Sequence, residues 1–105
     1  MFLQDEFPGA QVLTAENGEA GLRVLDKEQV DVVVSDYRMP GMNGIEFLAR
    51  TPLPEARRIL LTALSDPGLR ERALESGIGA FVQKSRGPGE LLGAVRRALG
   101  QAHEG

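Results

Sequence analysis

The sequence lacks cysteine and has a single histidine, His103, near the C-terminus. The first absence excludes disulfides, thiolate metal sites and a cysteine nucleophile, and the second excludes a histidine metal cluster. No apolar run approaches the roughly 20 residues that span a bilayer. The first residues include Asp5 and Glu6 and no cationic segment, so they do not resemble a secretory signal peptide, which begins with positive charge. These absences predict a cytoplasmic protein without a membrane partner.

Length and charge limit the organisation further. The 105 residues are 42% hydrophobic and 26% charged, which is ordinary for one small globular domain. We find no internal repeat or linker, so residues 1–105 are expected to form a single domain with no output domain attached. The net charge of −3 provides no basic field, and direct binding of nucleic acid is therefore not expected.

Short β-type runs alternate with amphipathic stretches along the chain. Such alternation predicts an α/β fold with a parallel sheet of about four strands and right-handed crossovers. Residues 1–7 look like the end of a helix, as though a strand and most of one helix were missing in front. The predicted strands are residues 11–15, 31–35, 57–62 and 79–84, and the predicted helices are residues 18–27, 43 onward, 66–76 and 88 onward.

A polar residue stands at the carboxyl end of each of the last three predicted strands: Asp36, Thr62 and Lys84. A parallel sheet brings such ends to one edge, where the crevices of open α/β sheets lie. A carboxylate can attack phosphorus, a hydroxyl can donate to a phosphoryl oxygen and a lysine can neutralise its charge. Alone, each residue has an ordinary explanation, as a turn carboxylate, a strand-end residue or a solvated cation. Their common register is what favours a phosphoryl site.

Three segments in order, which carry four matching residues, resemble response-regulator receiver domains of two-component signalling. SDYRMPGMNGIEFL resembles the phosphoacceptor segment around Asp36, and LLTA the segment of the switch hydroxyl, Thr62. GAFVQK supplies a switch aromatic, Phe81, and a phosphate-binding lysine, Lys84. The resemblance implies a flavodoxin-like, doubly wound sheet with strand order 2-1-3-4-5.

By that resemblance, a histidine kinase or phosphotransfer protein would phosphorylate Asp36. Mg²⁺ would bind Asp36 and the backbone carbonyl of Arg38. Phosphorylation would draw in Thr62, let Phe81 turn inward and so alter a partner surface. No enzymatic activity on a separate substrate is expected.

The sequence departs from the family in two places. The acidic pair that follows the first strand in receivers is missing, because Asp5 and Glu6 lie in what resembles the next helix. Mg²⁺ requires near-octahedral oxygen coordination, so we expect weak or absent Mg²⁺ binding and impaired phosphorylation. Ser85 stands where many receivers have a proline after a cis bond, which predicts a trans or strained peptide.

The missing first strand would be central in the 2-1-3-4-5 order. Two outcomes are open: residues 11–15 pair directly with the Asp36 strand, or a second chain fills the gap. Because open sheet edges favour association, we expect a homo-oligomer.

Other functions compete with a phosphorylated receiver. The first is a non-phosphorylated pseudo-receiver that acts by protein contacts alone. An aspartate-nucleophile phosphatase of the haloacid dehalogenase type needs a second aspartate at position 38, which is Arg38. A dinucleotide site would rest on Gly77 and Gly79, which precede a strand instead of following one.

Overall fold

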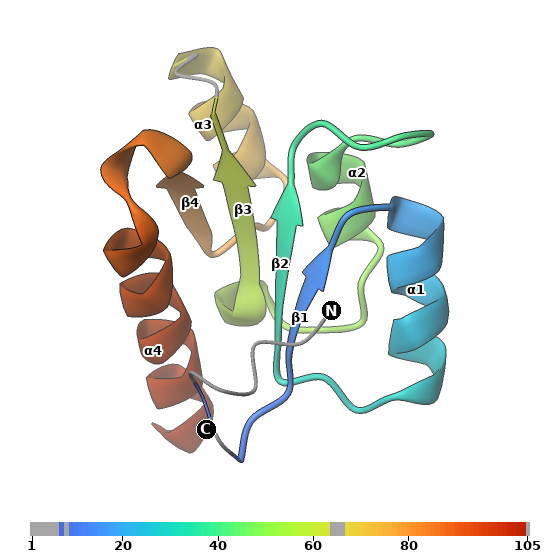
Figure 1. Cartoon of the computed structure of the whole chain (residues 1–105), viewed down its shortest axis with the longest axis vertical. Helices are drawn as coiled ribbons and strands as arrows, with labels where there is room; N and C mark the ends of the chain where they lie inside the picture. Colours follow the sequence, from blue (N-terminus) through green and yellow to red (C-terminus); the bar gives the residue numbers. More distant parts are fainter. Residues whose placement is uncertain (1–6, 8, 64–66, 105) are drawn as a thin grey trace.

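In the computed structural model, which describes Phe7 and residues 9–63 and 67–104, the centre of the chain is a parallel sheet (Figure 1). The sheet has four strands in the order β1-β2-β3-β4, and every neighbouring pair is parallel. This confirms the predicted α/β class. The strands are β1 (Val12–Ala15), β2 (Val32–Asp36), β3 (Arg58–Thr62) and β4 (Ala80–Gln83).

Helices connect the strands and follow the last one. The predicted helix over residues 18–27 is confirmed with both bounds, and the final helix is the longest at 17 residues. The helices are α1 (Gly18–Lys27), α2 (Gly44–Ala49), α3 (Pro67–Glu75) and α4 (Pro88–Glu104), with short 3₁₀ helices η1 (Glu55–Arg57) and η2 (Lys84–Arg86).

The two faces of the sheet carry separate hydrophobic clusters. On one face, α1, α2 and α3 contribute to a cluster with strand residues such as Leu13, Val33 and Leu60. On the other face, Val95 and other apolar residues of α4 pack against strand residues such as Val32 and Ile59. Connections that all advance in one direction along a parallel sheet place their helices on one face, because they are almost always right-handed. The sequential strand order therefore explains this division.

Asparagine side chains fix where two of the helices begin. The Asn17 side chain accepts hydrogen bonds from the backbone N–H of Glu19 and Ala20 at the start of α1. Asn43 accepts from the Glu46 N–H at 2.9 Å, while Glu46 accepts from the Asn43 N–H at 3.2 Å. This reciprocal pair is the capping box that N-G-I-E predicts. It starts α2 directly after the loop that follows Asp36.

The β1–β2 pairing answers the question of the missing central strand. Leu13 lies opposite Val33, and Ala15 lies opposite Ser35. The first of the two predicted outcomes is therefore observed: β1 pairs directly with β2, the strand that ends at Asp36. The gap that led us to expect a second chain is closed within this chain, and the oligomeric state stays a prediction.

Several predicted bounds need correction. Asp36 is the last residue of β2 instead of the first residue after it, and Arg57 belongs to η1. Lys84 begins η2 and does not end β4, because the chain turns there to reach α4. No peptide bond in the described residues is cis, so the bond before Ser85 is trans. Of the helix end predicted at residues 1–7, only Phe7 is described, and it lies in a bend outside any helix. Residues 1–6, the helix start at Asp66 and the side chain of His103 lie outside what the structure describes.

Arg58 ties the amino end of β3 to two loops. Its guanidinium donates to the carbonyl oxygens of Leu53 at 2.9 Å, Thr51 at 3.2 Å and Gly77 at 3.2 Å. Leu53 and Thr51 belong to the connection between α2 and β3, whereas Gly77 follows α3. The planar fork of arginine suits such multiple contacts. Arg58 thus ties the start of β3 both to the connection that precedes the strand and to the segment that follows α3. Thr62 lies at the other end of the same strand.

Candidate functional site

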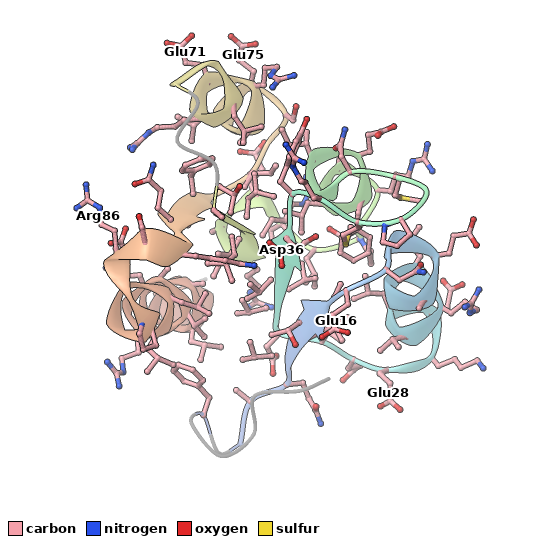
Figure 2. The ribbon with its side chains drawn as sticks, turned by 45° about the horizontal axis from the view of Figure 1, so that its top comes forward. Glu16, Glu28, Asp36, Glu71, Glu75 and Arg86 are labelled. Carbon is pink, nitrogen blue, oxygen red and sulfur yellow. The ribbon has the colours of Figure 1, made fainter. Side chains whose placement is uncertain are left out.

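The carboxyl ends of β2 and β3 place Asp36 and Thr62 at the same edge of the sheet. Asp36 lies opposite Leu61 in the ladder, so Thr62 is one residue further along the neighbouring strand. Figure 2 shows Asp36 at the tip of β2 in the middle of this edge. The edge was predicted from the positions of hydrophobic runs, and the ladder confirms that the strand ends meet.

A hollow of about 240 Å³ opens at this edge. Asp36 and Arg38 line it from β2 and the following loop, Thr62 and Ala63 from the end of β3, and Lys84 from the start of η2. The space can hold a group of the size of a phosphoryl. Three segments that are far apart in sequence therefore converge on one small, polar site.

Lys84 contacts Asp36 directly. Its Nζ donates to Oδ2 of Asp36 at 2.8 Å, and the two side chains are 44% and 38% exposed. A pair this exposed contributes only about 0–1 kcal/mol to folding stability. The contact thus matters mainly for the chemistry of the carboxylate, because it keeps a cation within reach of any oxygen bound there.

Thr62 and Phe81 differ in their relation to the hollow. Thr62 is only 2% exposed and lines the hollow. Phe81 lies opposite Leu60 in the β3–β4 ladder and packs partly buried against the cluster of α1, α2 and α3. Phe81 is not among the residues that line the hollow. The structure brings Asp36, Arg38, Thr62 and Lys84 together, while Phe81 stands one strand away as a core aromatic.

Gly44 supports the site in a way that the sequence analysis missed. A Cβ at this position would lie 2.2 Å from the backbone oxygen of Asp36 and 2.8 Å from a methyl carbon of Leu60. The Gly44 N–H donates to the Tyr37 oxygen at 2.7 Å. Only glycine therefore lets α2 begin so close to the phosphoacceptor candidate. The φ angle of Gly44 is not positive, so the requirement for glycine comes from this close approach and not from the backbone conformation.

The profile of the response regulator receiver domain matches residues 2–96. The chain belongs to this family. Among curated relatives, the transcriptional activator protein ExaE of Pseudomonas putida is 33% identical over 93% of this chain and 47% of its own length. The transcriptional regulatory protein GlrR of Escherichia coli K12 is 38% identical over 90% of this chain and 22% of its own length. The receiver domain thus spans less than half of these two relatives.

Solved structures support the fold of this receiver domain. The signal receiver domain of an HD domain-containing protein from Pseudomonas fluorescens Pf-5 superposes with a TM-score of 0.77 and 31% identity, covering 98% of this chain and 86% of that one. A CheY-like receiver domain protein from Methanospirillum hungatei JF-1 also gives 0.77, with 26% identity over 95% of this chain and 82% of that one. The flavodoxin-like fold expected from the resemblance is confirmed.

Receivers of this family generally bind Mg²⁺, and we tested whether the donors present fit it. The described residues contain no group of three acidic or histidine side chains that could hold a metal. Asp36 and the Arg38 carbonyl are the oxygen donors predicted at the hollow. Glu16 follows β1 at the same edge (Figure 2), but it lines a different hollow. Because Mg²⁺ needs several convergent oxygens, the described residues alone do not fit a complete site. Asp5 and Glu6 are outside the described residues.

The helices were also compared with the requirements of a bilayer. Across residues 9–63 and 67–104, no helix has the combination of length and apolar character that crossing a membrane requires.

Proposed function

We propose that this chain is a phosphoacceptor receiver domain whose Asp36 accepts a phosphoryl group from a histidine kinase or a phosphotransfer protein. In this step a carboxylate oxygen of Asp36 forms the new O–P bond while the N–P bond of a donor phosphohistidine breaks, and the imidazole leaves. The observation that carries the proposal is the 2.8 Å contact between Lys84 and Asp36 in a hollow shared with Thr62. Acyl phosphate formation needs such a carboxylate beside a cation.

The other residues of the site have complementary roles in this proposal. Lys84 neutralises charge on the incoming phosphoryl oxygens, and its flexible stem lets the ammonium follow them. Thr62, buried at the edge of the hollow, supplies a hydroxyl to the bound group. Phe81 is the switch aromatic, and its partly buried packing against the α1–α3 cluster is what a change at Thr62 would disturb. The outcome is a change in a partner surface, without turnover of a separate substrate.

Mg²⁺, when bound, would neutralise charge at the transferring phosphoryl group and would be held by Asp36 and the Arg38 carbonyl. Two such donors leave most of the octahedral positions to water. We therefore propose that binding is weak or absent and that phosphorylation of this chain is slower than in receivers with a full acidic set.

The same observation supports a second candidate, the pseudo-receiver that acts by protein contacts alone. In that case the contact between Lys84 and Asp36 would simply satisfy both charges, and the hollow would stay without a phosphoryl group. The two candidates share the fold and differ only in whether Asp36 reacts.

Labelling with radioactive acetyl phosphate, with and without Mg²⁺, tests the choice. We expect acid-stable, base-labile label on the parent chain and none on Asp36→Asn. Asp26→Asn, which changes an exposed carboxylate on α1, is the matched control and should label like the parent. Label that persists in Asp36→Asn contradicts the proposed acceptor. Absence of label under both conditions favours the pseudo-receiver.

Further aspects of the function are proposals of the same kind. We propose a cytoplasmic location, no direct contact with nucleic acid and a homo-oligomer in solution. A second copy would add at the outer edge of β1 or of β4, because these are the two terminal strands of the sheet. Light scattering at micromolar concentration tests the oligomer, and a clean monomer contradicts it.

A further inference from the structure

Ser35 immediately precedes Asp36 in β2 and is only 1% exposed. Its hydroxyl donates to the backbone oxygen of Asp36 at 2.8 Å. Met39 Sδ lies 3.4 Å from the same hydroxyl and is the weaker acceptor. A buried hydroxyl that binds the carbonyl of the very next residue holds the peptide plane between Asp36 and Tyr37 in one orientation.

Gly44 lies close to the same carbonyl. Since a Cβ at Gly44 would stand 2.2 Å from the Asp36 oxygen, the first turn of α2 rests against it. The Asp36 carbonyl therefore has both a hydrogen-bond donor and the backbone of α2 close to it. The chain that leaves Asp36 passes through Tyr37 to Arg38, which lines the hollow together with Asp36.

We propose that Ser35 is a positioning residue for the phosphoacceptor: its hydroxyl fixes the backbone of Asp36 so that the carboxylate faces Lys84 and the hollow. The inference rests on the proposed function of Asp36, and it adds a residue that neither the sequence analysis nor the family resemblance assigned to the site. Placement of reacting groups within fractions of an ångström is worth large factors in rate. A small buried hydroxyl can thus influence the reaction without touching the phosphoryl group.

The chain offers a close comparison for this role. Thr51 is 4% exposed, and its Oγ1 donates to the Leu48 oxygen at 2.8 Å, at the end of α2. Both Ser35 and Thr51 are buried hydroxyls bound to local backbone carbonyls at the same distance. Only Ser35 acts on the carbonyl of Asp36. Removal of either hydroxyl should cost similar stability, whereas only the loss of Ser35 should affect the site.

The experiment compares Ser35→Ala and Ser35→Thr with Thr51→Val in the full chain. Thermal unfolding first confirms that each variant folds. Two readouts follow: the rate of labelling of Asp36 by acetyl phosphate, and the ¹⁵N signal of the Lys84 ammonium, whose protons exchange slowly with water only while they are hydrogen-bonded. We expect Ser35→Ala to slow labelling on the order of tenfold and to weaken the ammonium signal. Ser35→Thr, which keeps the donor, should restore both.

The two readouts separate the two proposals. If the parent chain does not label, the proposed function fails, while the ammonium signal still decides the role of Ser35. If Ser35→Ala matches Thr51→Val in the ammonium signal, and in labelling where the parent labels, Ser35 is only a structural residue and the inference is overturned. Where Ser35→Thr fails to fold because of its extra methyl group, the comparison of Ser35→Ala with Thr51→Val decides.

Discussion

Lys84 and Asp36 are 48 residues apart in sequence, and their charged groups meet at 2.8 Å. One side chain comes from the end of β2 and the other from η2, so the contact joins the two strand ends that flank β3 at this edge. It spans the position of Thr62 and defines the hollow in which a phosphoryl group is proposed to bind.

Replacement of Lys84 should separate stability from function. In Lys84→Met we expect the free energy of unfolding to change by less than about 1 kcal/mol, because the pair is exposed. Labelling of Asp36 should slow by about tenfold or more, because a cation near the developing charge is lost. The matched control is Arg86→Met, which removes the 3.9 Å contact between Arg86 and Glu90. Urea unfolding and acetyl phosphate labelling measure the two effects. Equal labelling of both variants would contradict the role of Lys84.

Gly44→Ala should destabilise the domain and disturb the site together. The added Cβ meets the Asp36 oxygen and a Leu60 side chain, and such overpacking typically costs about 1–3 kcal/mol. Gly100→Ala is the control, since a Cβ there meets no atom within 4 Å. That substitution in α4 should be neutral or stabilise by up to about 1 kcal/mol. Chemical denaturation gives both values, and an unchanged midpoint for Gly44→Ala would show that α2 can shift away from Asp36.

Arg58→Lys tests the three carbonyl contacts at the amino end of β3. A lysine ammonium cannot reproduce the planar fork, so we expect a loss of about 1–3 kcal/mol as partly buried carbonyls lose their charged donor. Arg96→Lys, at an exposed position of α4, should stay within about 0.5 kcal/mol of the parent. Thermal unfolding of the two variants makes the comparison. A similar midpoint for both would mean that water replaces the guanidinium without cost.

The capping box of α2 predicts a measurable coupling. Asn43→Ala should cost about 1 kcal/mol, and Glu46→Ala should remove the acceptor of the Asn43 N–H. Because each side chain binds the backbone of the other residue, the double variant should lose less than the sum of the single losses. Urea midpoints of the four proteins give the coupling energy. Strict additivity would indicate that the two hydrogen bonds form independently.

Much of the fold follows from local patterns that can be read from the sequence. The helix between Gly18 and Lys27 is bounded by a capping asparagine and by loss of its apolar period, and the structure reproduces both ends. N-G-I-E gives the start of α2 for a similar reason. Hydrophobic runs that end in polar residues were enough to predict that Asp36, Thr62 and Lys84 lie at one edge of the sheet. These features depend on residues that are close in sequence.

Features that depend on distant parts of the chain were not predicted to the same degree. Whether β1 would pair with β2 or leave a gap depends on the energy of a whole ladder, and local pattern leaves both outcomes open. The role of Gly44 depends on how closely α2 approaches Asp36, and the role proposed for Ser35 depends on where its hydroxyl points; composition reveals neither. Lys84 was predicted to end the last strand, as part of GAFVQK, whereas the path toward α4 bends the chain into η2.

The strand order also bears on how the molecule forms. Each strand in the series β1 to β4 lies beside the one that precedes it in the sequence, yet every ladder pairs distant residues, such as Val12 with Val32 and Val33 with Arg58. Each parallel ladder must therefore bring separated parts of the chain together before its contacts form, which slows folding relative to a helical bundle. α4 joins residues that are still further apart in sequence, because its Val95 belongs to one hydrophobic cluster with Val32 and Val34 of β2. The hydrophobic cluster on this face, which contains residues from Phe7 to Ala98, is therefore complete only when the last helix is in place.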